Sequence, residues 1–339
     1  MRVPTRPGGI IFRSTLLVLA LLCGGSVSLP ADDDPPRKMP EAVARVLPWL
    51  PEETETLFVG RSVTLTDFES DEARSWQDYG VNLAVGDRGD KDLKRFRGRK
   101  IECIVAGAMN FDGVSSFGSL RSERCSILVF KDDLGETGKE WTEDLRKTAK
   151  AVRTMVGHEV FVFPSTTVME PWVKETSWQG TYFVLLKPNI VLCASSDRML
   201  ETMLRRINDV PKKRALPDSL PEWKHVDFQA PVWMIRHVPQ TGKRDQPVGS
   251  IALFMKNSFR VTYIPRTENE KYQELVKAEW LPEKLFETEK SRDQIKIERQ
   301  PDNTVVVTCD KPLIGENTFL IWFAWQLYRM QAYELFQVR

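Results

Sequence analysis

The sequence predicts an α+β fold made of two similar units, each a mainly antiparallel sheet with helices packed on one face. Short runs rich in Val, Ile, Phe and Leu succeed one another between turn formers and charges, without strict alternation with helical patterns. The segments VLPWLPEETETLFVGRSV and ALPDSLPEWKHVDFQAPVWMIRHV both pass through Leu-Pro and Pro-Glu into a strand-like run. We interpret this similarity as an internal duplication.

In the first unit, strands are expected wherever an apolar run is bounded by polar residues. These strands are 56–61, 101–109, 125–131, 158–163, 181–186 and 190–194. Pro188 and Asn189 suit the turn between the last two, because proline presets one turn dihedral and asparagine tolerates the next. Apolar spacing predicts helices over 137–156 and 198–207, the second of them capped by Asp197.

The second unit follows the same plan in shorter form. Its expected strands are 231–238, 250–256, 260–264, 294–298 and 304–309, and its expected helices are 268–281 and an amphipathic, aromatic helix over 318–336. A polar, proline-containing linker at 209–218 separates a first domain, 41–208, from a second, 219–339.

The N-terminus is typical of a secretory signal. Arg2, Arg6 and Arg13 precede the short apolar run 16–22, which predicts a signal peptide over 1–28 and a flexible Asp- and Pro-rich leader over 29–40. We therefore expect export to the periplasm or the medium. Cys23 offers a lipid-anchor alternative, which Leu22 disfavours because it stands where a lipoprotein signal has a small residue. No apolar run in the mature chain reaches the length of a membrane span.

Charge and cysteine content bound the chemistry further. Without the signal the chain has 45 Lys and Arg against 47 Asp and Glu, a net charge of −2, so no overall field attracts nucleic acid. Four cysteines remain, each in an apolar strand-like segment: Cys103, Cys125, Cys193 and Cys309. We expect buried free thiols, with one or two disulfides as the alternative. No C-x-x-C spacing suggests zinc or thioredoxin-type chemistry.

Motif searches assign no catalytic, cofactor-binding or metal-ligating residue. The segment DDLGETGKEW resembles a phosphate loop, but Asp133 and Glu140 replace its first glycine and its hydroxyl residue, so Thr137 and Glu140 are read as a capping box. FDGVSSFGS is not a G-x-S-x-G nucleophile motif. The three histidines, His158, His225 and His237, have no partner at a metal-site spacing and are expected to be solvated or hydrogen-bonded.

Two groups of residues are candidate contact sites. Trp172 and Trp178 lie in a polar stretch between strands and are the two tryptophans expected to be exposed, for a partner protein or a sugar. A basic cluster around Phe96 is the best candidate for a polyanion, although a solvated loop or strand edge is the preferred interpretation. Its members are Lys94, Arg95, Arg97, Arg99 and Lys100.

The layout resembles uncharacterised exported bacterial proteins that carry two β-rich, Leu-Pro-initiated units after a signal peptide, a resemblance that implies no site residue. We favour an exported, non-catalytic protein with a binding or structural role that it fulfils through protein–protein contacts. One alternative is an exported hydrolase acting on glycans with carboxylates scattered in sequence. Another is a carbohydrate-binding module that uses exposed tryptophans. No cofactor is expected, and the oligomeric state stays open.

Overall fold

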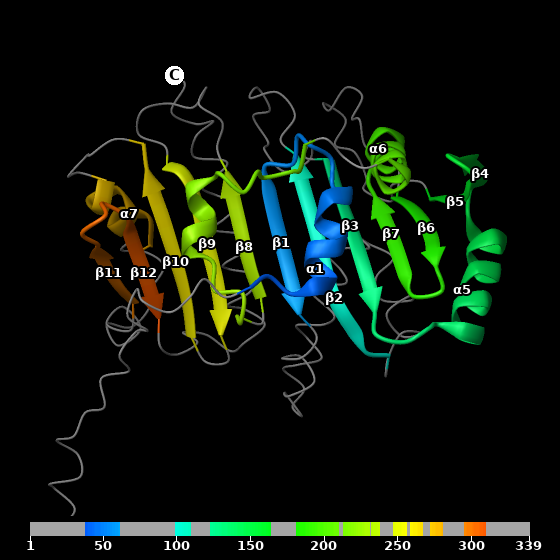
Figure 1. The fold of residues 1–339 in the computed structure, drawn as a ribbon, viewed down its shortest axis with the longest axis horizontal. Helices are drawn as coiled ribbons and strands as arrows, with labels where there is room; N and C mark the ends of the chain where they lie inside the picture. The colour runs from blue at the N-terminus through cyan, green and yellow to red at the C-terminus, as the bar shows by residue number, and fades with distance from the viewer. Residues whose placement is uncertain are drawn as a thin grey trace, which may run out of the picture. The chain divides into compact units, whose positions relative to one another are not determined.

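A computed structural model describes ten stretches of the chain, in which Figure 1 labels the helices and strands. The described residues are 38–61, 99–109, 123–163, 181–209, 213–230, 232–237, 247–255, 258–266, 272–280 and 295–309. They contain the helical elements α1 (Glu41–Val46), η1 (Leu47–Trp49), α5 (Gly135–Thr148), α6 (Asp197–Asn208), η3 (Pro221–His225) and α7 (Tyr272–Trp280).

The strands join into one antiparallel sheet of twelve, in the order β11-β12-β10-β9-β8-β1-β2-β3-β7-β6-β5-β4. Strands β1 and β8 pair with each other, so both predicted units contribute to the same sheet (Figure 1). Their bounds are β1 (Thr56–Arg61), β2 (Ile101–Met109), β3 (Glu123–Phe130), β4 (Ala151–Met155), β5 (His158–Phe163), β6 (Thr181–Lys187), β7 (Ile190–Ala194), β8 (Val232–His237), β9 (Pro247–Met255), β10 (Ser258–Pro265), β11 (Ile295–Arg299) and β12 (Val305–Cys309).

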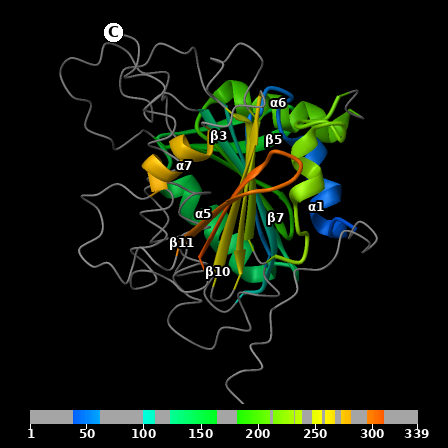
Figure 2. The same ribbon diagram turned by 90° about the vertical axis from the view of Figure 1, so that its left-hand side faces the viewer.

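Successive side chains along each strand point to opposite faces of the sheet, so the apolar residues form two separate cores. Ile127 lies in the larger core, which also takes Met203 of α6 and the buried residues of α1, whereas the next residue, Leu128, lies in the smaller core with Trp141 of α5. Figure 2 shows α1 and α5 on opposite sides of the sheet. We refer to the two sides as the α6 face and the α5 face.

One predicted helix is shorter than its pattern suggested. The helix expected over 137–156 is α5, which ends at Thr148, and 151–155 forms β4 instead. Strand β4 joins β5 through a tight turn at Val156 and Gly157, whose φ values of 50° and 81° are those of a two-residue hairpin turn. The glycine and the pairing with β5 therefore outweigh the helical spacing of Val152 and Met155.

Two predicted caps are also wrong. The first residue of α6 is Asp197, and the cap is Ser196, whose Oγ accepts a hydrogen bond from the Met199 N–H. Thr137 lies inside α5, where its hydroxyl accepts a hydrogen bond from Arg99 rather than forming a capping box with Glu140. The first turn is set instead by Asp133, whose Oδ1 accepts from the Gly135 N–H.

The mixed α+β class and the large antiparallel sheet are confirmed. The two similar units are not confirmed, nor is a single helix-covered face, and the domain boundary at 209–218 stays a prediction. The signal, the leader up to residue 37 and the aromatic C-terminal helix over 318–336 lie outside the described residues. None of the described helices is long and apolar enough to span a membrane.

Candidate functional site

Polar and charged side chains gather in two places on the α6 face. The first group, which we call the α6 cluster, surrounds the start of α6 and comprises Glu123, Arg153, Tyr182, Asp197 and Arg198. The second group, the η3 cluster, lies around η3 and comprises Glu222, His225, His237, Arg260 and Asp302. Because sheet interiors are mostly apolar, each cluster needs a physical explanation.

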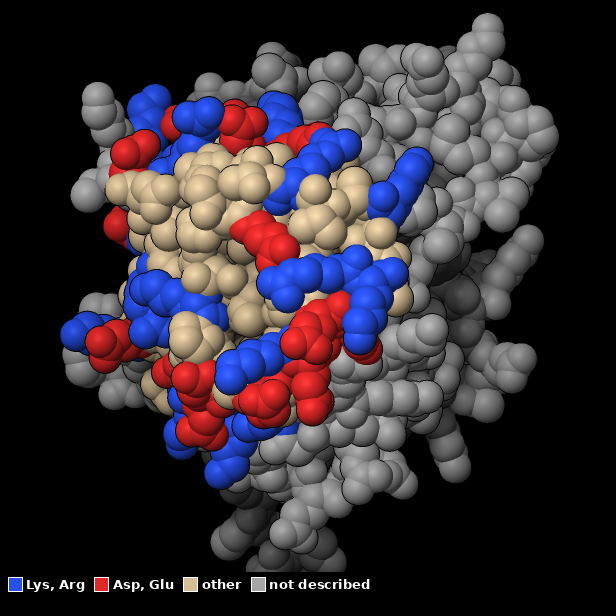
Figure 3. Space-filling view, turned by 90° about the vertical axis from the view of Figure 1, so that its right-hand side faces the viewer, with Lys and Arg blue, Asp and Glu red and all other residues tan. Residues whose placement is uncertain are grey.

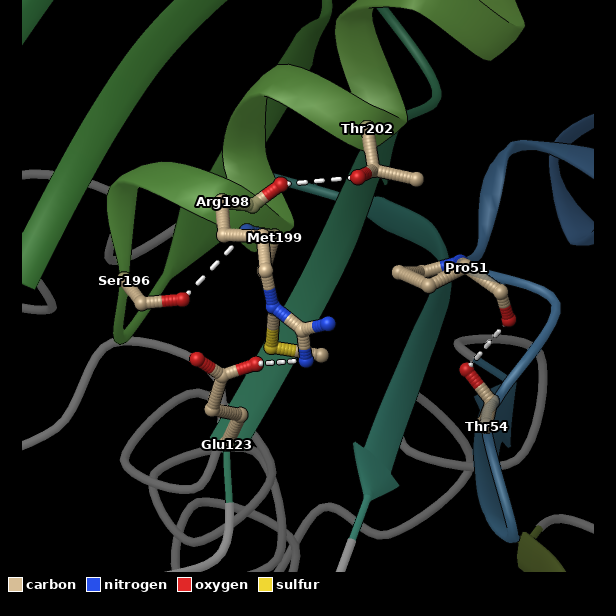
Figure 4. Close-up of polar contacts among 7 residues, drawn as sticks. All are labelled: Pro51, Thr54, Glu123, Ser196, Arg198, Met199 and Thr202. Atoms are coloured by element: carbon tan, nitrogen blue, oxygen red, sulfur yellow. Dashed lines mark hydrogen bonds and ion pairs between the residues drawn. The ribbon is translucent and has the colours of Figure 1, made fainter. Parts of the chain in front are cut away.

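The α6 cluster fastens α6 to the sheet (Figure 4). Glu123, at the start of β3, is buried, and its Oε2 accepts a hydrogen bond of 2.8 Å from the Arg198 guanidinium. On the same turn, Ser196 caps the helix and the Thr202 hydroxyl donates to the Arg198 carbonyl at 2.8 Å. Removing Arg198 would leave the buried Glu123 carboxylate without its charged partner, so this contact stabilises one helix position.

A tyrosine and a second ion pair complete this cluster. Arg153 of β4 lies 3.2 Å from the Asp197 carboxylate, so it links the edge strand to α6. Burial, together with the charge and hydrogen bonding of Asp197, raises the pKa of Tyr182 to about 12. A phenol with so high a pKa is a poor proton donor at neutral pH, and the arrangement fits a structural contact.

The η3 cluster contains a buried carboxylate–imidazole pair. Glu222 is fully buried, and its Oε1 lies 2.7 Å from Nδ1 of His237, which is 27% exposed. Its other oxygen, Oε2, is buried and has no hydrogen-bond partner among the described residues. Gly249 of β9 makes room for this carboxylate, since a Cβ there would lie 1.9 Å from Oε1. The pair leaves Nε2 of the imidazole as the group that can meet another molecule.

The other members of the η3 cluster are His225 of η3, Arg260 of β10 and Asp302 in the turn between β11 and β12. Burial lowers the pKa of the His225 imidazole. The negative charge of Asp302 acts to raise this pKa, and the positive charge of Arg260 lowers it further. Burial likewise lowers the pKa of Arg260. Burial alone would raise the pKa of Asp302, but hydrogen bonds from Thr304 lower it, its Oδ1 accepting from the Thr304 N–H at 3.0 Å and the hydroxyl at 2.7 Å.

Cys103 and Cys125 are unsuited to nucleophilic chemistry. Cys103, Cys125, Cys193 and Cys309 are buried and form no disulfide, which agrees with the preferred expectation. Burial raises the pKa of Cys103 and of Cys125 to about 12, so neither forms a thiolate near neutral pH. Cys103 pairs in register with Val129, and Cys125 pairs with Gly107, so these two cysteines are not opposite each other.

Comparisons with known proteins assign no family. No protein-family model matches the chain, and no curated protein matches it. Among solved structures, crystal form I of TP0453 is similar with a TM-score of 0.46 at 9% identity, covering 84% of this chain and 98% of that chain. Crystal form III of TP0453 has a TM-score of 0.42 at 11% identity, covering 78% and 92%. At these values the similarity carries no argument about function.

Few of the predicted contact residues fall within the described stretches. Trp172, Trp178, Lys94, Arg95 and Arg97 lie outside them. Of the basic cluster, Arg99 donates to the Thr137 hydroxyl at 2.5 Å and Lys100 is exposed.

Sequence reasoning missed the η3 cluster, because Glu222 and His237 are 15 residues apart and meet only when η3 packs over β9. The expectation that the histidines are hydrogen-bonded holds for His237. Within the described residues, no group of three or more His, Cys, Asp or Glu could hold a metal ion.

Proposed function

We propose that the protein is an exported, non-catalytic binding protein that holds an extended segment of a partner protein along strand β4. The observation that carries the proposal is the exposure of this strand, which is the last in the sheet order and pairs with β5 on one side. Val152, Arg153 and Thr154 are all exposed, and Val152 has 44% of its surface exposed. Such an edge can accept an added strand.

The backbone of β4 is arranged for such pairing. The two-residue turn makes Met155 and His158 a hydrogen-bonded pair, and alternation makes Arg153 hydrogen-bond to β5 as well. The N–H and C=O groups of Val152 and Thr154 therefore point to the outer edge. Figure 3, which views the molecule from the side that carries β4 and α5, shows an uncharged area bordered by Lys, Arg, Asp and Glu. An uncharged centre within a polar rim is typical of protein interfaces.

The polar clusters support a non-catalytic role. The Glu123–Arg198, Arg153–Asp197 and Glu222–His237 contacts each join different elements of the fold. Each therefore has a structural explanation, and export is inferred from the N-terminal sequence.

The test is site-specific photo-crosslinking in the cell envelope. A crosslinking amino acid at position 152 should capture one defined partner, whereas the same group at Lys139, exposed on α5, should not. Thr154→Pro removes an outward N–H and should abolish the crosslink, while Thr154→Ala should keep it. Equal capture from positions 152 and 139, or capture unaffected by Thr154→Pro in a folded variant, would refute strand addition.

The second candidate is an exported hydrolase, and the Glu222–His237 pair is the observation that favours it. A buried carboxylate that holds an imidazole leaves Nε2 available as a general base. Assays of the mature protein on purified envelope glycans decide between the candidates. Hydrolysis that is lost in His237→Gln and reduced in Glu222→Gln would support the hydrolase and contradict the non-catalytic proposal.

A further inference from the structure

We propose that Arg260 of β10, together with His225 of η3 and Thr308 of β12, forms an anion-binding site for a carboxylate or phosphate group. This site is separate from the β4 edge and does not depend on it. The proposal starts from a cation with an unused donor: Arg260 is half-buried, and its Nε is buried without a hydrogen-bond partner among the described residues. Arginine presents a planar fork of donors that matches the two oxygens of a carboxylate or phosphate.

Nearby acids do not supply that partner. Asp302 is the acid whose charge acts on Arg260, but no ion pair within 4.0 Å joins the two among the described contacts. Its Oδ1 already accepts two hydrogen bonds from Thr304. A half-buried guanidinium without an ion pair is costly to desolvate, and its lowered pKa reflects that cost. An external anion would offset it.

Other donors surround the guanidinium. The strand register sets Thr308 directly opposite Arg260 on β12, and Leu253 directly opposite on β9, so the hydroxyl of Thr308 lies on the same face. Leu253 belongs to the core of the α6 face, which fixes the side of the sheet to which Arg260 points. From above, η3 packs on β9 and β10 and brings His225 close enough for the two charges to interact.

The chemistry of the site favours an anion over a cation. Arg260 and the Thr308 hydroxyl can donate hydrogen bonds, and so can one ring nitrogen of neutral His225. Lys224, exposed on η3, adds a positive charge that also acts on His225. Bound phosphate or carboxylate would accept from several of these donors at once, which is the arrangement that gives a small anion useful affinity.

Histidine NMR provides a direct readout, because the chain has three histidines. Inorganic phosphate, and acetate in a separate series, are titrated into the mature protein at constant ionic strength and pH. The imidazole signals of His225 should shift with saturation, while those of His158 on β5 should not. Saturation by phosphate alone assigns a phosphate site, and saturation by both assigns a general carboxylate or phosphate site.

Variants test the role of the guanidinium. Arg260→Leu should weaken binding at least tenfold, and Arg260→Lys, which keeps the charge but loses the fork, should weaken it several-fold. The matched control is Arg146→Leu, since Arg146 is exposed and already paired with Glu159 at 2.7 Å; it should leave affinity unchanged. Thermal unfolding separates binding from folding: without anion, Arg260→Leu should unfold at the same or a higher temperature. Unchanged affinity in Arg260→Leu, no saturable shift at His225, or marked destabilisation of Arg260→Leu without anion would overturn the site.

Discussion

Replacing Gly249 by alanine tests the η3 cluster most directly. A Cβ at this position would lie 1.9 Å from Oε1 and 2.6 Å from Cδ of Glu222, and 2.7 Å from the backbone carbonyl oxygen of Arg236. Heavy atoms do not approach so closely, and a backbone oxygen in the middle of a sheet cannot move aside easily. Gly249→Ala should therefore push the Glu222 carboxylate out of its buried position and separate it from His237.

The size of the effect follows from burial. Displacing the buried Glu222 carboxylate breaks its hydrogen bond with the His237 imidazole and leaves a buried charged group without its partner, which costs about 3 kcal/mol. Gly60 of β1 is the matched control, because the nearest atom to its added Cβ is the Cε1 of Phe58 at 3.6 Å, an ordinary contact. Alanine there should stabilise the strand by about 0.5 kcal/mol. The two variants should thus differ by about 3.5 kcal/mol.

Urea unfolding of the mature protein measures these free energies. A double variant, Glu222→Ala with Gly249→Ala, gives a further check, since the added methyl group then occupies space that the carboxylate has left. Its stability should equal or exceed that of Glu222→Ala alone, although Gly249→Ala by itself is destabilising. If Gly249→Ala were within about 0.5 kcal/mol of Gly60→Ala, the buried position of Glu222 would be refuted.

Three further predictions concern other parts of the fold. Val156 has a φ of 50°, which a β-branched residue rarely adopts, so Val156→Asn should raise the free energy of unfolding by about 1 kcal/mol in urea titrations; a loss of stability would contradict the turn. Ser196→Ala should lower it by about 1 kcal/mol, with Ser196→Asp as the control that keeps a cap. Stability should also fall above pH 9. The thiols of Cys103 and Cys125 lose their protons near pH 9 when unfolded but near 12 when folded, so the unfolded state binds fewer protons and each thiol contributes a fall of up to about 1.4 kcal/mol per pH unit. Replacing both cysteines by alanine should flatten this part of the pH profile, and an unchanged profile would show that they are not its cause.

Local sequence predicted most strands because their apolar runs are short and clearly bounded. The strands expected at 56–61, 101–109, 158–163 and 190–194 have the same bounds in the structure. Strand β4 was missed because its apolar positions continue the helical spacing of α5, and its pairing with β5 depends on the turn at Gly157. Periodicity does not distinguish a helix from a strand in so short a segment, and the pairing with β5 determines that it is a strand.

The η3 cluster could not be predicted for a different reason. Glu222 looked like one acidic residue among many, and its burial arises only when η3 packs over β9. One local signal was available: Gly249 directly precedes the expected strand at 250–256 and lies inside the observed β9, where an isolated glycine often marks the close approach of another group. The identity of that group is a property of the tertiary fold.

The distribution of polar residues along the sheet indicates where a ligand can approach. Beneath α6 the α6 face is apolar, as Ile127 and Val184 show. On β10 and β12, Val261 and Val307 are directly paired on the opposite side of the sheet and are fully buried. Their neighbour Arg260 consequently faces the η3 side. At this end of the sheet, strand alternation therefore places Arg260 and Thr308 on the η3 side. Because a core cannot accept a charged ligand without a partner charge, we expect a charged ligand, among the described parts of the fold, on the η3 side of β10 and β12.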